Sequence, residues 1–175
     1  MNDVLKLVGS VLIMAACIGY TGYLLEKQKA HRDVLQALIS MLDLLSGKLR
    51  YERMTMGEAL AGLNKKYHGA VGCVMGRIAD RLMAGNCENL ESIWRTEFAE
   101  AQKELMLTEE EMDIVLETGK NLGYLDVEAQ MGHLKNCRVR LEGKLEAAQR
   151  EFVERRRVYR YLGVAVGVMV ILVLI

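Results

Sequence analysis

Two charge-free apolar runs near the ends of the sequence constrain its fold more than any other feature. Residues 7–25 read LVGSVLIMAACIGYTGYLL, and residues 161–175 read YLGVAVGVMVILVLI. A helix over 7–25 would be about 28 Å long, close to the thickness of the hydrocarbon core of a bilayer. A helix over 158–175 would be about 27 Å long, with the Arg160 side chain extending toward the headgroups. The pattern therefore predicts two transmembrane helices around a soluble region.

These runs divide the chain into four predicted segments. A short tail over 1–6 precedes the first span at 7–25, a soluble helical-bundle domain covers 26–157, and the second span covers 158–175. Two alternatives remain for the first run, a cleaved signal peptide and a lipoprotein signal in which MAAC ends at Cys17. A lipoprotein signal turns polar after its cysteine, whereas this run continues as IGYTGYLL, so an uncleaved span is favoured. The alternative for the second run is a buried core helix, because a short apolar stretch can be internal.

Basic residues gather on the inner flank of each run and indicate an orientation. Lys27, Lys29 and Arg32 follow the first run. By the positive-inside tendency, both flanks and the whole middle region are expected in the cytoplasm. The tyrosines before the second run stand where an interfacial aromatic belt is expected, and the arginines there could also bind anionic lipid. The predicted interface-anchoring residues are Arg155, Arg156, Arg157, Tyr159 and Tyr161.

Small residues four positions apart occur within both predicted spans. Gly163 and Gly167 form a GxxxG pattern in the second, and Ala15 and Gly19 form a similar pair in the first. This spacing lets membrane helices approach each other closely. We therefore predict helix packing through these residues, with a homo-oligomer as one form that it could take.

The middle region reads as all-α, a compact antiparallel bundle of about six helices whose first and last helices extend into the two spans. The sequence contains no proline, and a leucine stripe with alternating spacings of three and four predicts a helix to about Tyr51. TMGE at Thr55–Glu58 and TEEE at Thr108–Glu111 are capping-box patterns that mark two helix starts. Helices are also predicted over about 56–66 and 71–83, and around Trp94 and Phe98. The leucine stripe is Leu35, Leu38, Leu42, Leu45 and Leu49.

The last soluble helix is predicted to begin after a turn in NLGYLD. Gly123 suits a left-handed C-terminal cap and Asp126 suits the next N-cap. A near-heptad apolar stripe follows, with Arg138 at the one place where an apolar residue is missing. The stripe consists of Val127, Met131, Leu134, Leu141, Leu145, Ala148 and Phe152.

Several functions are disfavoured by what the sequence lacks. It has 23 basic and 23 acidic residues without a long basic stripe, which argues against a nucleic-acid partner. Its four cysteines and three histidines show neither CxxC nor HExxH spacing, so no metal site is predicted. No phosphate-binding loop, nucleophile elbow or converging acid–base group is recognisable. We therefore expect no catalytic residues, no cofactor and no enzymatic activity.

The stretch GKNLGYLDVEAQ resembles the signature of the stage III sporulation protein AB family. Its pattern Gly-x-x-Leu-Gly-x-x-Asp-x-x-x-Gln is met by Gly119, Leu122, Gly123, Asp126 and Gln130. The opening LKLVGSVLI, the stripe LQALISMLDLL, the tryptophan at 94 and the closing LGVAVGVMVILVLI agree with the layout of the family. SGKLRY and RMTMGEAL depart from it, because they lack the acids and the proline that the family usually has there.

The resemblance implies a fold and a role. Members of the family are similar to the cytoplasmic domains of the inner-membrane platform proteins of type II secretion systems and type IV pili. By resemblance, this chain would be a non-enzymatic platform or adaptor in the mother-cell membrane, within the channel complex that links mother cell and forespore. Its partners would be membrane lipid, a cytosolic ATPase of the same operon and other stage III sporulation membrane proteins. Two alternatives are a two-span sensor that binds a small ligand outside the cell and a lipoprotein anchored through Cys17.

The turn in this motif is also the first place to look for partner contacts. A glycine-capped turn followed by a capping aspartate presents a rigid corner, and we predict a possible interaction corner at Gly119, Leu122, Gly123, Asp126 and Gln130. Purely structural capping is the alternative for the same residues.

Overall fold

The structure, a computed structural model, describes the backbone of residues 2–52, 56–66, 69–85, 89–120, 122 and 127–174. It describes the side chains of residues 19, 22–50, 56–63, 69–85, 89–120, 122 and 128–154. The chain forms two compact units. One, the end unit, combines Met1–Ala30 with Ala147–Ile175, and the other, the bundle unit, is His31–Glu146.

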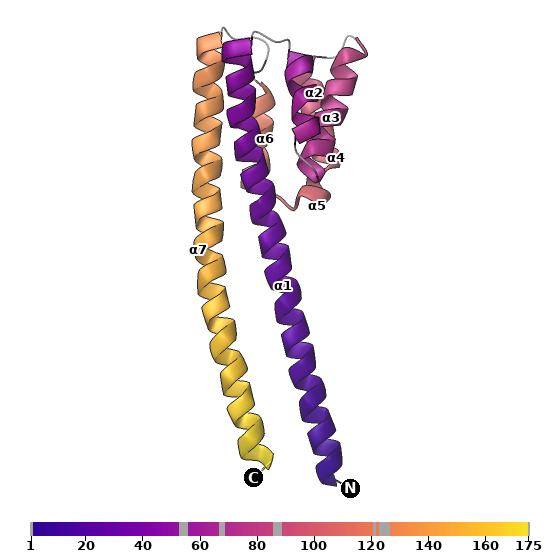
Figure 1. Ribbon diagram of the computed structural model, residues 1–175, viewed down its shortest axis with the longest axis vertical. Coiled ribbons are helices and arrows are strands. Elements are labelled where there is room, and N and C mark those ends of the chain that lie inside the picture. Colours follow the sequence, from indigo (N-terminus) through magenta and orange to yellow (C-terminus); the bar gives the residue numbers. More distant parts are fainter. Residues whose placement is uncertain are drawn as a thin grey trace. The chain divides into compact units, whose positions relative to one another are not determined.

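The described residues form α-helices, and no strand occurs among them (Figure 1). The prediction of an all-α fold is thus confirmed. The helices in chain order are α1 (Asn2–Gly47), α2 (Met56–Lys66), α3 (Ala70–Met83), α4 (Leu90–Glu100), α5 (Gln102–Leu105), α6 (Glu109–Lys120) and α7 (Val127–Leu174). A π-helical turn over Lys48–Glu52 follows α1, so the regular helix ends four residues before the Tyr51 that was predicted.

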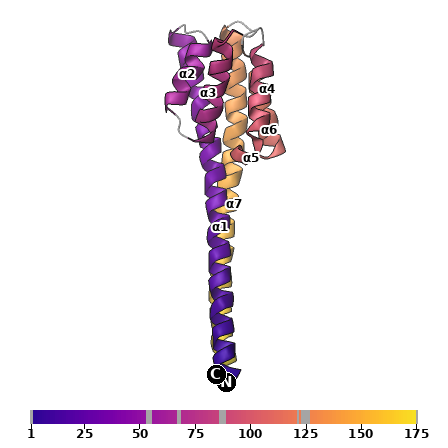
Figure 2. The same ribbon diagram turned by 90° about the vertical axis from the view of Figure 1, so that its right-hand side faces the viewer.

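The core of the bundle unit is built from the leucine stripe of α1 and from residues of α2, α3, α4, α5, α6 and α7. The first four stripe residues of α1 are at most 1% exposed, whereas Leu49, in the π-helical turn, is half-buried. Figures 1 and 2 show α2 beside α3, Figure 2 shows α4 beside α6, and both pairs are in contact. α3 also packs against α4, so a continuous series of helix contacts leads from α2 to α6. Each helix buries one apolar face, as the helical periodicity of the sequence predicts.

Local capping explains where two of the short helices begin. Asn89 is the N-cap of α4, and its side chain accepts a hydrogen bond of 2.7 Å from the backbone N–H of Ser92. Before α6, the left-handed Met106 (φ 52) ends α5 and reverses the chain. The capping box at Thr108–Glu111 then begins α6, as predicted. The predicted box at Thr55–Glu58 includes a residue outside the described ones.

The register of α7 differs from the prediction by about one residue. The inward-facing positions are Gln130, Leu134, Cys137 and Leu141, whereas Met131 is half-buried. The near-heptad stripe predicted Arg138 on the apolar face, but Cys137 occupies that position. Leu134 and Leu141 belong to both stripes, and a small rotation of a helix exchanges neighbouring ridges without changing their spacing.

The described side chains of the end unit are those of residues 19, 22–30 and 147–154. Tyr23 is 64% exposed and Val153 is 59% exposed. Among the residues searched, which are the described ones, no helix has a stretch of sufficient length and apolarity to cross a membrane. Apart from Gly19 and 22–25, the predicted spans at 7–25 and 158–175 fall outside the residues with described side chains, as does Cys17.

Candidate functional site

Among the described glycines, Gly119 of α6 has the least space for a side chain, because Trp94 of α4 packs directly against it. A Cβ atom on Gly119 of α6 would lie 2.3 Å from both Cγ and Cδ1 of Trp94 on α4. The Trp94 indole N–H donates a 2.8 Å hydrogen bond to the Val115 carbonyl, one turn before Gly119. The ring of Phe98 lies 4.9 Å from that of Trp94, tilted by 40°. Gly119 thus provides the space in which the indole reaches the α6 backbone.

The motif residues that the structure describes are buried. Gly119 is buried, Leu122 is 1% exposed and Gln130 is 8% exposed. Gly123 and Asp126 lie outside the described residues. The contacts of Gly119 explain its place in the motif by packing, and the interaction corner stays a prediction.

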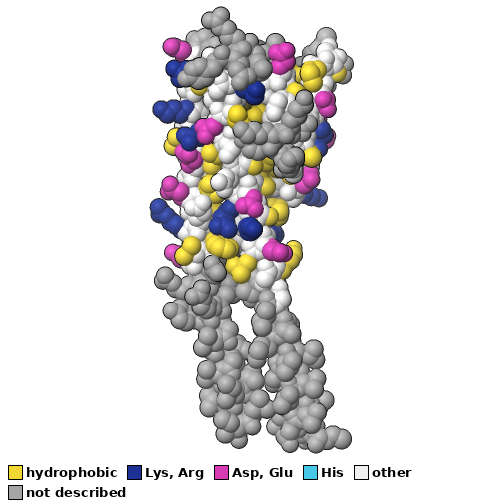
Figure 3. Space-filling model, in the orientation of Figure 1, with side chains coloured by type: hydrophobic (Ala, Val, Ile, Leu, Met, Phe, Trp, Pro, Cys, Tyr) yellow, Lys and Arg dark blue, Asp and Glu magenta, His cyan; other side chains and the backbone are white. Residues whose placement is uncertain are grey.

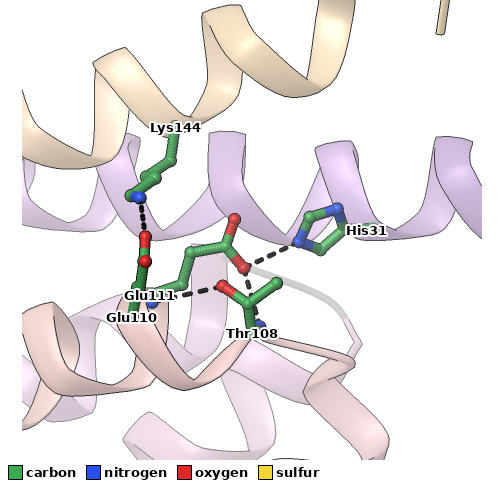
Figure 4. Close-up of polar contacts among 5 residues, drawn as sticks. All are labelled: His31, Thr108, Glu110, Glu111 and Lys144. Carbon is green, nitrogen blue, oxygen red and sulfur yellow. Dashed lines mark hydrogen bonds and ion pairs between the residues drawn. The ribbon is translucent and has the colours of Figure 1, made fainter. Parts of the chain in front are cut away.

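A second feature of α6 is the network around its first turn (Figure 4). Oε2 of Glu111 accepts a 2.8 Å hydrogen bond from the backbone N–H of Thr108, and the Thr108 hydroxyl accepts a 3.3 Å bond from the N–H of Glu111. The same Oε2 atom lies 2.8 Å from Nε2 of His31 on α1. One carboxylate therefore both caps α6 and connects it to α1.

Glu111 is only 3% exposed, and its charge is retained by these bonds. Burial by itself would raise the pKa of Glu111, but the bonds from His31 and Thr108 together outweigh burial and lower that pKa below its ordinary value. The carboxylate is therefore ionised near neutral pH. Since an ionised carboxylate only accepts hydrogen bonds, Nε2 of His31 must carry the hydrogen between them.

Another buried carboxylate joins α3 to α4. Glu97 is 4% exposed, with Oε2 2.7 Å from Nε of Arg77 and Oε1 2.9 Å from a terminal nitrogen of Arg81. Burial opposes its ionisation, but the hydrogen bonds from Arg81 and Arg77 prevail and lower the pKa of Glu97. Because Arg77 and Arg81 are four residues apart, they lie on one face of α3. Each arginine binds one of the two oxygens of the Glu97 carboxylate.

Ion pairs at the surface join α7 to two other helices. Arg140 pairs with Glu117, and Lys144 pairs with Glu110, both on α6. Nε of Arg138 lies 2.7 Å from a carboxylate oxygen of Asp43 on α1. Exposed pairs of this kind typically stabilise a fold by less than about 1 kcal/mol each. The packing of α7 therefore depends mainly on its four inward-facing residues.

The thiol and imidazole groups on α7 are engaged in packing. Sγ of Cys137 lies 3.7 Å from Nε2 of His133, and the same Nε2 lies 3.0 Å from the Glu117 carbonyl oxygen. Burial raises the pKa of the Cys137 thiol, which keeps it in the unreactive protonated form. In the part of the chain that the structure describes, no group of three or more His, Cys, Asp or Glu side chains could hold a metal ion.

The predicted anchoring and span-packing residues are mostly beyond the described side chains. Gly19 is exposed, and none of the described atoms lies within 4 Å of where its Cβ would be. The residues outside the described side chains are Ala15, Arg155, Arg156, Arg157, Tyr159, Tyr161, Gly163 and Gly167.

Glu97 and His31 were not predicted as functional residues from the sequence. Arg77 and Arg81 are four residues apart on α3, and Glu97 stands between the buried Trp94 and Phe98 on α4. An acidic residue beside an apolar helix face, with an arginine pair on another helix, was the available signal. No comparable signal pointed to His31, because its partner is 80 residues away.

The surface of the bundle unit offers mixed chemistry for contacts. On the face in Figure 3, basic and acidic side chains are interspersed, with hydrophobic side chains between them. Among the described side chains of the bundle unit, three large hydrophobic ones are exposed: Met83 (57%), Met106 (37%) and Val139 (53%). They belong to α3, to the residue after α5 and to α7, and they are the described apolar positions that a partner could contact.

Comparisons by sequence and by structure lead to one family. Residues 6–175 match the family model described as Stage III sporulation protein AB (spore_III_AB). The Stage III sporulation protein AB of Bacillus subtilis (strain 168) is 24% identical over 171 residues, which cover 97% of this chain and 99% of that protein. A solved structure of Stage III sporulation protein AB (SpoIIIAB) has a TM-score of 0.66 at 19% identity, covering 71% of this chain and 97% of its own. This structural likeness shows a shared fold.

Proposed function

The chain belongs to the Stage III sporulation protein AB family, and from this premise we propose that it is a non-enzymatic membrane platform of a sporulation channel complex. In this role it holds a helical bundle at the mother-cell membrane by two spans, at 7–25 and 158–175. The bundle faces the cytoplasm and docks a cytosolic ATPase of the same operon together with other stage III sporulation membrane proteins. Contacts within the membrane involve lipid and a second copy of the chain.

The observation that carries this proposal is the length of the first and last helices. α1 runs over Asn2–Gly47 and α7 over Val127–Leu174, so both include residues of the bundle unit and the apolar runs of the end unit. A platform needs such a continuous connection, because a load on the bundle must be transmitted to the anchor. The charge-free sequence of both runs supports their assignment as spans.

The absence of enzymatic activity is part of the proposal, and the chemistry of the buried carboxylates supports it. Glu97 and Glu111 are ionised and held by partners on other helices. A general acid or base requires a pKa near the working pH and access to substrate. Both carboxylates have lowered pKa values and are almost fully buried, so they suit the joining of helices.

Thiol labelling tests the orientation. Cys73 is exposed on α3 and Cys137 is buried, so a chain with the two remaining cysteines replaced by alanine carries one reactive and one protected thiol. A membrane-impermeant maleimide should leave this chain unlabelled in intact cells and label Cys73 after permeabilisation. Adding Cys73→Ala to the same chain is the matched control and should abolish the signal. Labelling in intact cells would refute the cytoplasmic platform and favour the two-span sensor.

Site-specific crosslinking tests the partners. A photoreactive residue at Val139 or Met106 should give crosslinks to the ATPase or to other proteins of the complex in sporulating cells. Leu105 is fully buried, and a photoreactive residue there is the control, which should crosslink only within the chain. The same yield of intermolecular products from Leu105 and from the exposed positions would contradict docking through the bundle surface. A mature chain that begins at Cys17 by mass spectrometry would indicate a lipoprotein.

A further inference from the structure

The contact between His31 and Glu111 differs from every other described interhelical ion pair, because its cation changes charge near neutral pH. Arg77 and Arg81 hold Glu97, and arginine and lysine make the exposed pairs of α7. An unperturbed histidine titrates at about pH 6.5, whereas arginine stays charged. The side chain of His31 is 22% exposed, so protons of the solvent can reach it, and that of Glu111 is 4% exposed.

We propose that His31 is a proton-controlled latch, whose protonation strengthens the attachment of α1 to the first turn of α6. The neutral imidazole donates its Nε2 hydrogen to Oε2 of Glu111, at 2.8 Å. Protonation at Nδ1 leaves that bond in place and adds a positive charge beside a buried negative one. The acceptor is ionised in both states, and protonation adds to the bond the attraction between two opposite charges. The latch therefore has a weaker state at high pH and a stronger state at low pH.

The charged groups described along this contact belong to α1, α6 and α7. On α6, Glu110 pairs with Lys144 of α7, so the charges of these two side chains offset each other (Figure 4). On α1, Lys29 and Asp33 are exposed to solvent. Arg32 is permanently charged. The pKa of Glu111 is lowered, so this carboxylate keeps its charge throughout the range in which a histidine titrates.

The location of the latch gives the charge change a structural effect. Oε2 of Glu111 also accepts the bond from the backbone N–H of Thr108, so the atom that binds His31 belongs to the cap of α6. α6 in turn carries Gly119 and the Val115 carbonyl, against which the indole of Trp94 packs. Protonation of one side chain on α1 thus stabilises a helix that is part of the bundle core.

The sign of the effect follows from linkage. The folded state holds the proton of His31 more tightly than the unfolded chain does, because only the folded state places Glu111 beside the imidazole. The stabilisation is complete below about pH 6.5 and is lost as the pH rises through the titration of the folded state. Stability therefore decreases between about pH 5.5 and about pH 8, a range above the titration of the buried carboxylates.

Urea unfolding of the full-length chain in mild detergent tests the latch, with the fluorescence of Trp94, the single tryptophan, as the signal. Between about pH 5.5 and about pH 8, the unfolding equilibrium constant of the wild type should rise about 3- to 10-fold more than that of His31→Gln. Glutamine keeps a donor but does not titrate in this range. His133→Gln is the matched control, and its unfolding equilibrium constant should rise as much as that of the wild type.

A second variant separates the latch from a general loss of stability. Glu111→Gln removes the charge that His31 meets but keeps an amide oxygen that can accept from Thr108, so it should reduce the pH dependence as His31→Gln does. The two substitutions combined should reduce it no further. If the wild type, His31→Gln and Glu111→Gln show the same dependence, the latch is refuted. The latch would also be refuted if His133→Gln alone reduced the pH dependence of unfolding, because another histidine would then be responsible.

Discussion

Replacement of Gly119 by alanine tests the packing that we assign to the family motif. The added Cβ would lie 2.3 Å from two indole atoms of Trp94 and 2.9 Å from its Cβ, whereas an ordinary contact between carbon atoms is about 3.5–4.0 Å. Trp94 is 1% exposed and its N–H is bonded to the Val115 carbonyl, so the ring can move only by giving up buried contacts.

The expected loss of stability is the difference between two effects. Overpacking a buried contact costs about 1–3 kcal/mol, and the upper value suits an overlap with three atoms of a buried tryptophan. Alanine in place of glycine stabilises a helix by about 1 kcal/mol. The net loss is therefore about 2 kcal/mol, which lowers the urea midpoint by about 1 M. The assay is urea unfolding of the full-length chain in detergent, followed by Trp94 fluorescence.

Gly143→Ala is the matched control for this prediction. Gly143 is exposed on α7, and no described atom lies within 4 Å of where its Cβ would be. The same substitution should there raise the stability by up to about 1 kcal/mol. Gly119→Ala should also shift the native emission of Trp94 to longer wavelength, because the indole is displaced toward solvent. An unchanged emission with a midpoint equal to or above that of the wild type would refute the close approach of Gly119 to Trp94.

Three further predictions concern acid stability, capping and thiol reactivity. Because Glu97 has a folded pKa below its ordinary value of 4.5, the unfolded chain binds more protons there, and stability should fall as the pH drops through this range. Glu97→Gln should flatten this acid limb in urea unfolding at several pH values, and an unchanged limb would contradict the assignment. Thr108→Ala should cost about 1 kcal/mol of unfolding free energy, since it removes a helix cap, and a cost near zero would argue against that cap. In a chain with only two cysteines, Cys73 should react with a thiol reagent in the native state and Cys137 only on unfolding, whereas equal rates would show that the core is open.

Helix positions were largely predictable because their signals are local. The stripe of α1, the bounds of α2 and the capping box of α6 depend on residues within one or two turns of each other. The regular helix α1 ended earlier than predicted, at Gly47, because a π-helical turn replaced its last residues. The apolar periodicity of a sequence does not distinguish such a turn from a regular one.

The rotation of α7 was predicted less well, because a helix face is selected by its neighbours. Arg138 and Cys137 are adjacent, and the apolar stripe alone placed the arginine inside. The bundle selects Cys137 for the inward position, which allows Arg138 to pair with Asp43 of α1. A charged side chain left inside without such a partner would cost several kcal/mol, so the packed arrangement determines which ridge faces inward.

The family motif shows most clearly how local pattern and packing share the outcome. The residues of GKNLGYLDVEAQ identified the family and indicated a turn between two helices. Its glycine at 119 was assigned to an interaction corner, and only the folded chain shows Trp94 against it, from a helix 25 residues away along the sequence. The same holds for Glu111, whose capping role was readable from its spacing to Thr108, whereas its contact with His31 was not. Spacing along the chain determines local hydrogen bonds. The side chain that pairs with a buried charge, or that packs against a glycine, comes from another helix and is determined only when the chain is packed.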